Sequence, residues 1–130
     1  MDILEIKDLE TLAQKRVPKM FFDYVNSGSW TETTYNENIS DFQKIKLRQR
    51  VAIDMSNRIL ATKMVNQSVS MPVAIAPTGL TGMQRADGEI LAAQAAEEFG
   101  IPFTLSTMSV CSIEAVAEKT KTPSCCHWYV

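Results

Sequence analysis

The chain has 130 residues, of which 45% are hydrophobic and 22% charged, a composition ordinary for a globular domain with one core. Its net charge of -2 and its dispersed basic residues lack the electrostatic footprint of a nucleic-acid binder. No stretch is long and apolar enough to cross a bilayer, and the acidic start "MDILEIKDLE" differs from the basic start of a signal peptide. We therefore expect a cytoplasmic protein, whose three cysteines are reduced thiols.

The first part of the chain is expected to be helical. Asp8 suits the cap of a short helix that carries its apolar residues on one face. Pro18 suits the first position of a second helix, which runs through "KMFFDYVNSG" and stops at Gly28. After it, "ETTYNENISDF" carries apolar residues spaced among polar ones, and "KIKLRQRV" alternates as an extended segment does.

From Met71 onward, apolar runs alternate with helical patterns. The expected elements are a strand at 72–77, a helix at 88–100, a strand at 101–106, a helix at 112–120 and a final apolar run that ends in "WYV". This alternation favours a parallel sheet with right-handed crossovers, either doubly wound or part of a (β/α)8 barrel. A closed barrel takes roughly 250 residues, so on the barrel interpretation we expect over half of the protein to lie outside this chain.

The turn after the first expected strand is a candidate ligand site. Pro77, Thr78 and Gly79 follow the apolar run directly, and ligands of α/β proteins bind beyond the carboxyl ends of strands. A helix-start loop without a ligand is the alternative, because Gly79, Gly82 and Gly88 do not form the dinucleotide-binding fingerprint.

Several blocks of the sequence, in order, resemble one family. They are "PKMFFDYVNSGSWTETTYNEN", "RQRV", "SMPVAIAPTGLTGM", "DGE" and "GIPFTLSTMSVCSIEAVAE". Together they are similar to the FMN-dependent α-hydroxy-acid dehydrogenases, and to the bacterial respiratory members in particular. The resemblance implies a single α/β domain, the N-terminal part of a (β/α)8 TIM barrel. Its helical lead-in would occupy residues 1–70 and its first βαβαβ units residues 71–130, with FMN across the mouth of the strands.

The resemblance also implies which residues contact the cofactor. The backbone of Pro77, Thr78 and Gly79 would run close to the flavin ring, an approach that glycine permits. The hydroxyl of Ser106 would hydrogen-bond to the polar edge of the flavin, although a serine after a strand is more often a turn or cap residue. His127, in "PSCCHWYV", stands where the family has a glutamine that reaches the flavin. Its imidazole offers one hydrogen bond there, but not the paired donor and acceptor of an amide.

Two tyrosines are implied to contact the substrate. Tyr24 would bind the substrate carboxylate through its hydroxyl; on spacing alone, packing with Phe21 or Val25 in an amphipathic stripe is the alternative. Tyr129 would contact the substrate and stabilise charge on its α-oxygen. A phenol suits both tasks because it is a hydrogen-bond donor that stays neutral at physiological pH. The catalytic base and the cationic residues of the family are expected outside this chain.

No metal site or cysteine nucleophile is expected near the end of the chain. Cys125 and His127 would share one face of a strand, but no second pair of residues completes a zinc site. Cys126 and His127 would face opposite sides of the strand, which separates a nucleophile from its base.

The function implied by the resemblance is oxidation of an (S)-2-hydroxy acid to the 2-oxo acid, with L-lactate to pyruvate as the expected reaction. The electron acceptor would be a quinone, with oxygen and cytochrome as alternatives. Peripheral attachment to the inner face of the cell membrane and homo-oligomer formation at full length are further expectations. The alternative is a non-catalytic barrel fragment or interaction partner, because an incomplete barrel exposes strand edges and core surface.

Overall fold

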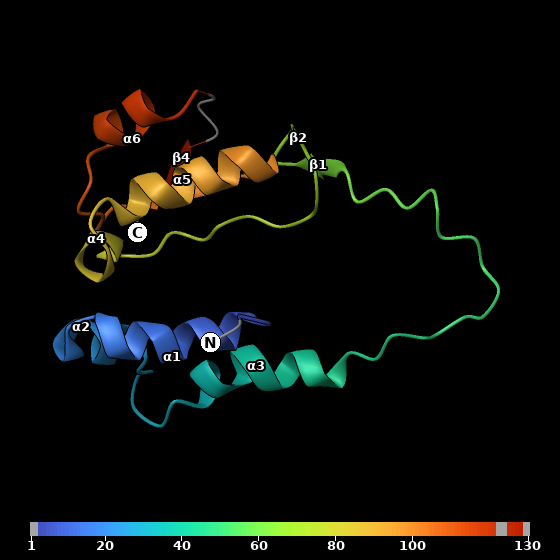
Figure 1. Cartoon of the computed structure of the whole chain (residues 1–130), viewed down its shortest axis with the longest axis horizontal. Coiled ribbons are helices and arrows are strands. Elements are labelled where there is room, and N and C mark those ends of the chain that lie inside the picture. The colour runs from blue at the N-terminus through green and yellow to red at the C-terminus, as the bar shows by residue number, and fades with distance from the viewer. Residues whose placement is uncertain (1–2, 122–124, 129–130) are drawn as a thin grey trace. The chain divides into compact units, whose positions relative to one another are not determined.

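The computed structural model describes residues 3–121 and 125–128. The chain divides into two compact units, Met1–Arg58 and Ile59–Val130 (Figure 1). The first unit is helical, and the second combines helices with short strands. No helix formed by the described residues has the length and apolar character needed to cross a membrane. The expected grouping of residues 1–70 and 71–130 within one catalytic domain stays a prediction.

The first unit contains three helices: α1 (Ile6–Arg16), α2 (Lys19–Val25) and α3 (Thr33–Lys44). Helix α1 begins after Glu5, so the prediction that Asp8 precedes the helix as its cap is wrong. Asp8 instead lies in the first turn, where its carboxylate accepts hydrogen bonds from the amides of Leu4 (2.8 Å) and Glu5 (3.1 Å). The arrangement with Glu5 is a capping box, which satisfies amides that the first turn leaves without a partner.

Helix α2 follows Pro18, which serves as its cap rather than as its first helical residue. The helix ends at Val25, before the expected stop at Gly28, and the amide of Asn26 closes its last turn on the carbonyl of Phe22 at 2.9 Å. Helix α3 covers most of the segment in which spaced apolar residues stand among polar ones.

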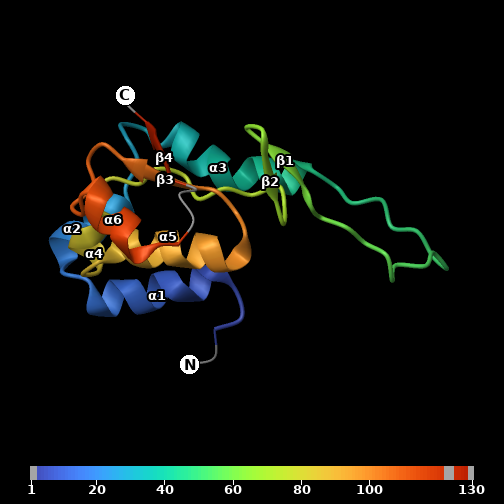
Figure 2. The ribbon, with the colours of Figure 1, turned by 90° about the horizontal axis from the view of Figure 1, so that it is seen from above.

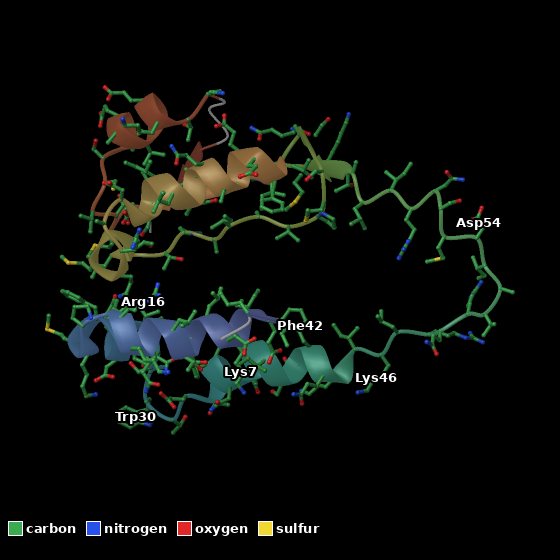
Figure 3. The ribbon with its side chains drawn as sticks, viewed as in Figure 1. Lys7, Arg16, Trp30, Phe42, Lys46 and Asp54 are labelled. Atoms are coloured by element: carbon green, nitrogen blue, oxygen red, sulfur yellow. The ribbon has the colours of Figure 1, made fainter. Side chains whose placement is uncertain are left out.

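None of the described residues of the first unit is buried. Trp30 is 97% exposed, and its side chain extends away from the ribbon (Figure 3). After α3, residues 45–61 contain neither helix nor strand and are all exposed (Figure 2). The described residues of the first unit, 3–58, therefore form no hydrophobic core.

The second unit begins with an antiparallel hairpin of β1 (Thr62–Met64) and β2 (Gln67–Val69), which the sequence analysis did not predict. Its two connecting residues, Val65 and Asn66, have left-handed backbone angles, with φ values of 48° and 63°. Two such residues match the twist of a tight hairpin.

Parallel pairing in the second unit confirms the expected βα arrangement. Strand β3 (Phe103–Ser106) pairs in parallel with β4 (Cys125–Trp128). The expected strand at 72–77 is reduced to one parallel bridge between Ile75 and Phe103. The amide of Ile75 donates to Pro102 (2.9 Å), and its carbonyl accepts from Thr104 (3.1 Å).

Three helices complete the second unit: α4 (Thr81–Gln84), α5 (Gly88–Phe99) and α6 (Ile113–Lys119). Helix α5 ends as predicted at Gly100, whose φ of 64° is a conformation that glycine adopts at no steric cost. Helices α5 and α6 and strand β3 enclose a small core, formed by Ala93, Ala96, Phe103, Leu105 and Val116. Strand β3 ends at Ser106, where the candidate site begins.

Candidate functional site

The turn at residues 77–79 follows the parallel bridge between Ile75 and Phe103. Pro77 and Thr78 are exposed, and Gly79 is half-buried. The hydroxyl of Thr81 donates to the carbonyl of Thr78 at 3.0 Å, so the short helix α4 holds the turn from behind. The turn thus presents backbone and a threonine hydroxyl at the surface.

The loop after β3 lies against this turn. The amide of Leu80 donates to the carbonyl of Met108 at 2.9 Å. A Cβ atom on Gly79 would lie 3.2 Å from the Cβ of Met108 and 3.8 Å from Oγ of Ser106. Because Gly79 has no side chain, the loop after β3 can approach the turn closely, and Thr78, Gly79 and Ser106 lie near one another. Their role toward a cofactor stays a prediction.

Ser106 is half-buried, and its Oγ accepts a hydrogen bond from the amide of Met108 at 3.1 Å. In this bond the Ser106 hydroxyl is the acceptor, and it donates to none of the described residues. The described residues give no acceptor for its proton, so the hydroxyl can still donate a hydrogen bond. This bond also shows that Ser106 shapes its own turn, which is the alternative role considered above.

A cavity of about 180 Å³ lies between these strand ends and α5. Hydroxyl-bearing residues and one carboxylate line part of it: Thr78, Thr81, Thr104, Ser106 and Glu89. Pockets that enclose a whole ligand are larger, roughly 300–1,000 Å³. The rest of the lining is apolar, and the hydroxyls of Thr78 and Thr81 already donate to the carbonyls of Ala76 and Thr78. The Ser106 hydroxyl and the exposed backbone beside Gly79 fit the polar edge of a flavin ring. The described residues therefore line a cavity that is smaller than a pocket for a whole ligand.

Glu89 is a residue that the sequence analysis did not assign to the site. Its side chain is 2% exposed, and Oε1 accepts hydrogen bonds from the amides of Gly82 (2.9 Å) and Val110 (3.0 Å). Burial raises the pKa of Glu89, but the hydrogen bonds from Val110, Gly82 and its own amide lower this pKa by more. The carboxylate is therefore ionised at neutral pH. In the sequence, the only sign of this role was the place of Glu89 in the first turn of a predicted helix. Acidic residues are common there in any case, because the helix dipole favours negative charge at its N-terminus.

The neighbouring Cys111 is a free, half-buried thiol. Burial raises the pKa of Cys111, and the hydrogen bond and negative charge of Glu89 raise it further, as does the charge of Asp87. Cys111 is therefore a neutral thiol at physiological pH and a poor nucleophile.

Tyr24 lies on α2 in the first unit and is 61% exposed. The half-buried aromatic residues of this helix are Phe21 and Phe22, so Tyr24 is not part of a buried stripe. In β4, the backbone of His127 pairs with Leu105, whereas the placement of its side chain and the whole of Tyr129 lie outside the described part of the chain. The cofactor and substrate roles of these three residues stay predictions.

A sequence profile of the FMN-dependent dehydrogenase family matches residues 13–130. The chain is 50% identical over 123 residues to an L-lactate dehydrogenase of Acinetobacter baumannii, a match that covers 95% of this chain and 32% of the relative. An L-lactate dehydrogenase of Stenotrophomonas maltophilia is 47% identical over 123 residues, with the same coverage of 95% and 32%. The chain thus spans about a third of the length of the curated relatives it matches.

Solved structures of (S)-mandelate dehydrogenase also match the chain. A soluble mutant of the membrane-associated (S)-mandelate dehydrogenase from Pseudomonas putida matches with a TM-score of 0.86 and 38% identity, over 92% of this chain and 34% of that one. A structure described as the monotopic membrane protein (S)-mandelate dehydrogenase matches with a TM-score of 0.86 and 36% identity, over 93% and 32%. These neighbours have the TIM-barrel fold, which confirms the predicted fold class. The chain belongs to the FMN-dependent dehydrogenase family.

Proposed function

We propose that this chain contributes to an FMN-dependent enzyme that oxidises an (S)-2-hydroxy acid, with L-lactate as substrate and pyruvate as product. The observation that carries the proposal is the contact between the Thr78–Gly79 turn and the Ser106 loop at neighbouring strand ends. Barrel enzymes place their ligands at this end of the strands. The relatives named L-lactate dehydrogenase support lactate as the substrate.

Bound FMN would supply the acceptor for the hydride equivalent of the substrate. The chain's own residues would bind and orient it. The backbone of Pro77, Thr78 and Gly79 would lie against the ring, and the Ser106 hydroxyl would donate its free proton to the polar edge of the ring. Because the amide of Met108 already occupies an acceptor position on Oγ of Ser106, the direction of that donation is restricted.

We propose that Tyr24 and Tyr129 contact the substrate. The exposure of Tyr24 leaves its hydroxyl accessible to a carboxylate. Tyr129, one of the last two residues of the chain, would face the α-oxygen of the substrate, and His127 would occupy the place of a flavin-binding glutamine. The family resemblance supports these three roles.

The electron acceptor and the location belong to the same proposal. A quinone would accept the electrons, as in respiratory members of the family. The neighbour described as a monotopic membrane protein supports attachment at the periphery of the inner face of the cell membrane. We further propose that the full-length protein is a homo-oligomer.

The test uses a hybrid enzyme, in which this chain replaces the region of the A. baumannii relative that it matches. The purified hybrid should retain stoichiometric FMN and reduce a dye in the presence of L-lactate. Residues 1–130 alone should neither retain FMN through gel filtration nor oxidise lactate, because the base and the phosphate site are expected elsewhere. A hybrid that folds but lacks both flavin and activity would support the non-catalytic alternative.

A further inference from the structure

Glu89 joins two segments that are far apart in the sequence: the turn that leads into α4, and the loop after β3. Both are called loops below. One oxygen, Oε1, accepts from the amide of Gly82 in α4 at 2.9 Å and from the amide of Val110 in the loop after β3 at 3.0 Å. A buried carboxylate is costly unless it is hydrogen-bonded, and two backbone donors on one oxygen provide that compensation. The position of this single atom therefore limits how far the two loops can separate.

The two loops approach each other closely at the same place. A Cβ atom on Gly82 would lie only 2.6 Å from the Cβ of Val110 and 3.0 Å from Oε2 of Glu89. No side chain fits there unless the loops move apart. Glycine at position 82 and the carboxylate at position 89 thus serve one close contact.

This contact lies next to the proposed flavin-binding atoms along both loops. Gly82 comes three residues after Gly79, and Val110 comes four residues after Ser106. The bond from Leu80 to Met108 links the same two loops between these positions. A change in spacing at Gly82 and Val110 would therefore change the separation between the turn and the Ser106 hydroxyl.

The second oxygen of Glu89 has a different environment. Oε2 is buried and takes no part in the bonds to Gly82 and Val110, and Glu89 lines the cavity to which Thr78 and Ser106 also contribute. The cavity, at about 180 Å³, has room for water, which suits an oxygen left over from the contact. Only one oxygen of the carboxylate is needed to hold the loops.

We propose that Glu89 is a positioning residue for the flavin: by holding Gly82 and Val110 together, it sets the spacing of the Thr78–Gly79 turn and Ser106. The inference rests on the proposed function, since it assigns flavin to those atoms. It extends that function to a buried residue that touches neither cofactor nor substrate.

The first experiment measures amide hydrogen exchange in the chain itself. The amides of Gly82 and Val110 should be protected in the wild type and should exchange about tenfold faster or more in Glu89→Ala. Glu89→Gln keeps an oxygen that accepts both bonds, so its amides should exchange more slowly than those of Glu89→Ala. Unprotected amides in the wild type, or amides that stay protected in Glu89→Ala, would overturn the contact.

The second experiment measures the FMN dissociation constant in the hybrid enzyme. Glu89→Ala should weaken FMN binding about tenfold or more, whereas Glu89→Gln should restore binding to within about threefold of wild type. Val116→Ala is the matched control, because Val116 is a core residue, 1% exposed, on α6 and outside both loops. It should destabilise the fold without a comparable loss of FMN.

The outcomes separate the two proposals. Equal FMN binding by wild type and Glu89→Ala, or an equal loss in Val116→Ala, would overturn the positioning role. A wild-type hybrid without FMN would overturn the proposed function and, with it, the role of Glu89 toward flavin. The exchange experiment would still decide whether Glu89 holds the two loops.

Discussion

The two units of the chain differ in what stabilises them. In the second unit, β3 is covered by α5 and α6, and Leu105 has no exposed surface. In the first unit, three helices of comparable length have no buried residue among those described, and Leu47 after them is 95% exposed. Helices of seven to twelve residues gain most of their stability from packing. The difference indicates that a buried core stabilises the second unit, whereas the described residues of the first unit form no such core.

Replacing one leucine in each unit gives the largest expected effect. Leu105→Ala removes the centre of the core and should lower the free energy of unfolding by about 2–5 kcal/mol. Leu47→Ala is the matched control and should change it by less than about 0.5 kcal/mol. Urea unfolding of the chain measures both. Similar losses in the two variants would remove the difference between the units.

Replacing Tyr24 tests whether an exposed residue of the first unit binds substrate. In the hybrid enzyme, Tyr24→Phe should raise KM for L-lactate about tenfold or more and affect kcat less, because a bond to the carboxylate is present in the ground state and the transition state alike. The melting temperature should not change, since the ring is 61% exposed. A lower melting temperature with unchanged kcat/KM would instead assign Tyr24 to packing.

Glu89 should make the stability of the second unit depend on pH. Glu89→Gln should lower the stability of the second unit by about 1–2 kcal/mol at neutral pH, because hydrogen bonds to a charged acceptor are stronger. The pKa of Glu89 is lowered in the folded state, so this contribution is complete above the ordinary pKa of a glutamate and is lost as pH falls through the lowered value.

The wild type and Glu89→Gln should therefore have similar free energies of unfolding at acidic pH. Asp87 is present in both, and Cys111 stays a neutral thiol over this range because its pKa is raised, so neither accounts for a difference. Chemical unfolding at a series of pH values measures the effect. A difference between the variants that is constant down to strongly acidic pH would contradict it.

Helix caps give the smallest expected effect. Ser112 caps α6 by accepting from the amide of Ala115 at 3.1 Å, and Ser112→Ala should cost about 1 kcal/mol of stability. Asp8→Ala removes the corresponding interaction from α1 and should cost less, because α1 has no buried residue to which its folding is coupled. Thermal melts of both variants would test this, and a larger loss from Asp8→Ala would indicate that α1 belongs to the cooperative unit.

The sequence predicted α5 and β3 well because their signals are local. Helix α5 combines an alanine-rich segment with a terminal glycine, and β3 is a short apolar run. The hairpin at 62–69 was missed because its turn is Val65-Asn66: valine is unfavourable at positive φ, and no glycine announces the turn. The pairing of the strands overrides that preference.

For the candidate site, residues at strand ends were predictable and the group that supports them was not. Thr78, Gly79 and Ser106 each follow an apolar run, which is visible in the sequence. The role of Glu89 depends on Val110, 21 residues away, and on the approach of two loops that no local pattern encodes. The extent of the first strand was also not predictable from its local pattern: of the expected residues 72–77, Ile75 alone forms a bridge.

The exposed segment at residues 45–61 has a consequence for proteolysis. It contains Lys46, Arg48, Arg50 and Arg58, all in backbone without helix or strand, and Lys46 is visible in Figure 3. Trypsin cleaves after such residues and acts fastest on exposed, unpaired backbone. Because Arg58 is also the last residue of the first unit, brief digestion should divide the chain at the boundary between the units and leave the α5 and β3 core as one resistant piece.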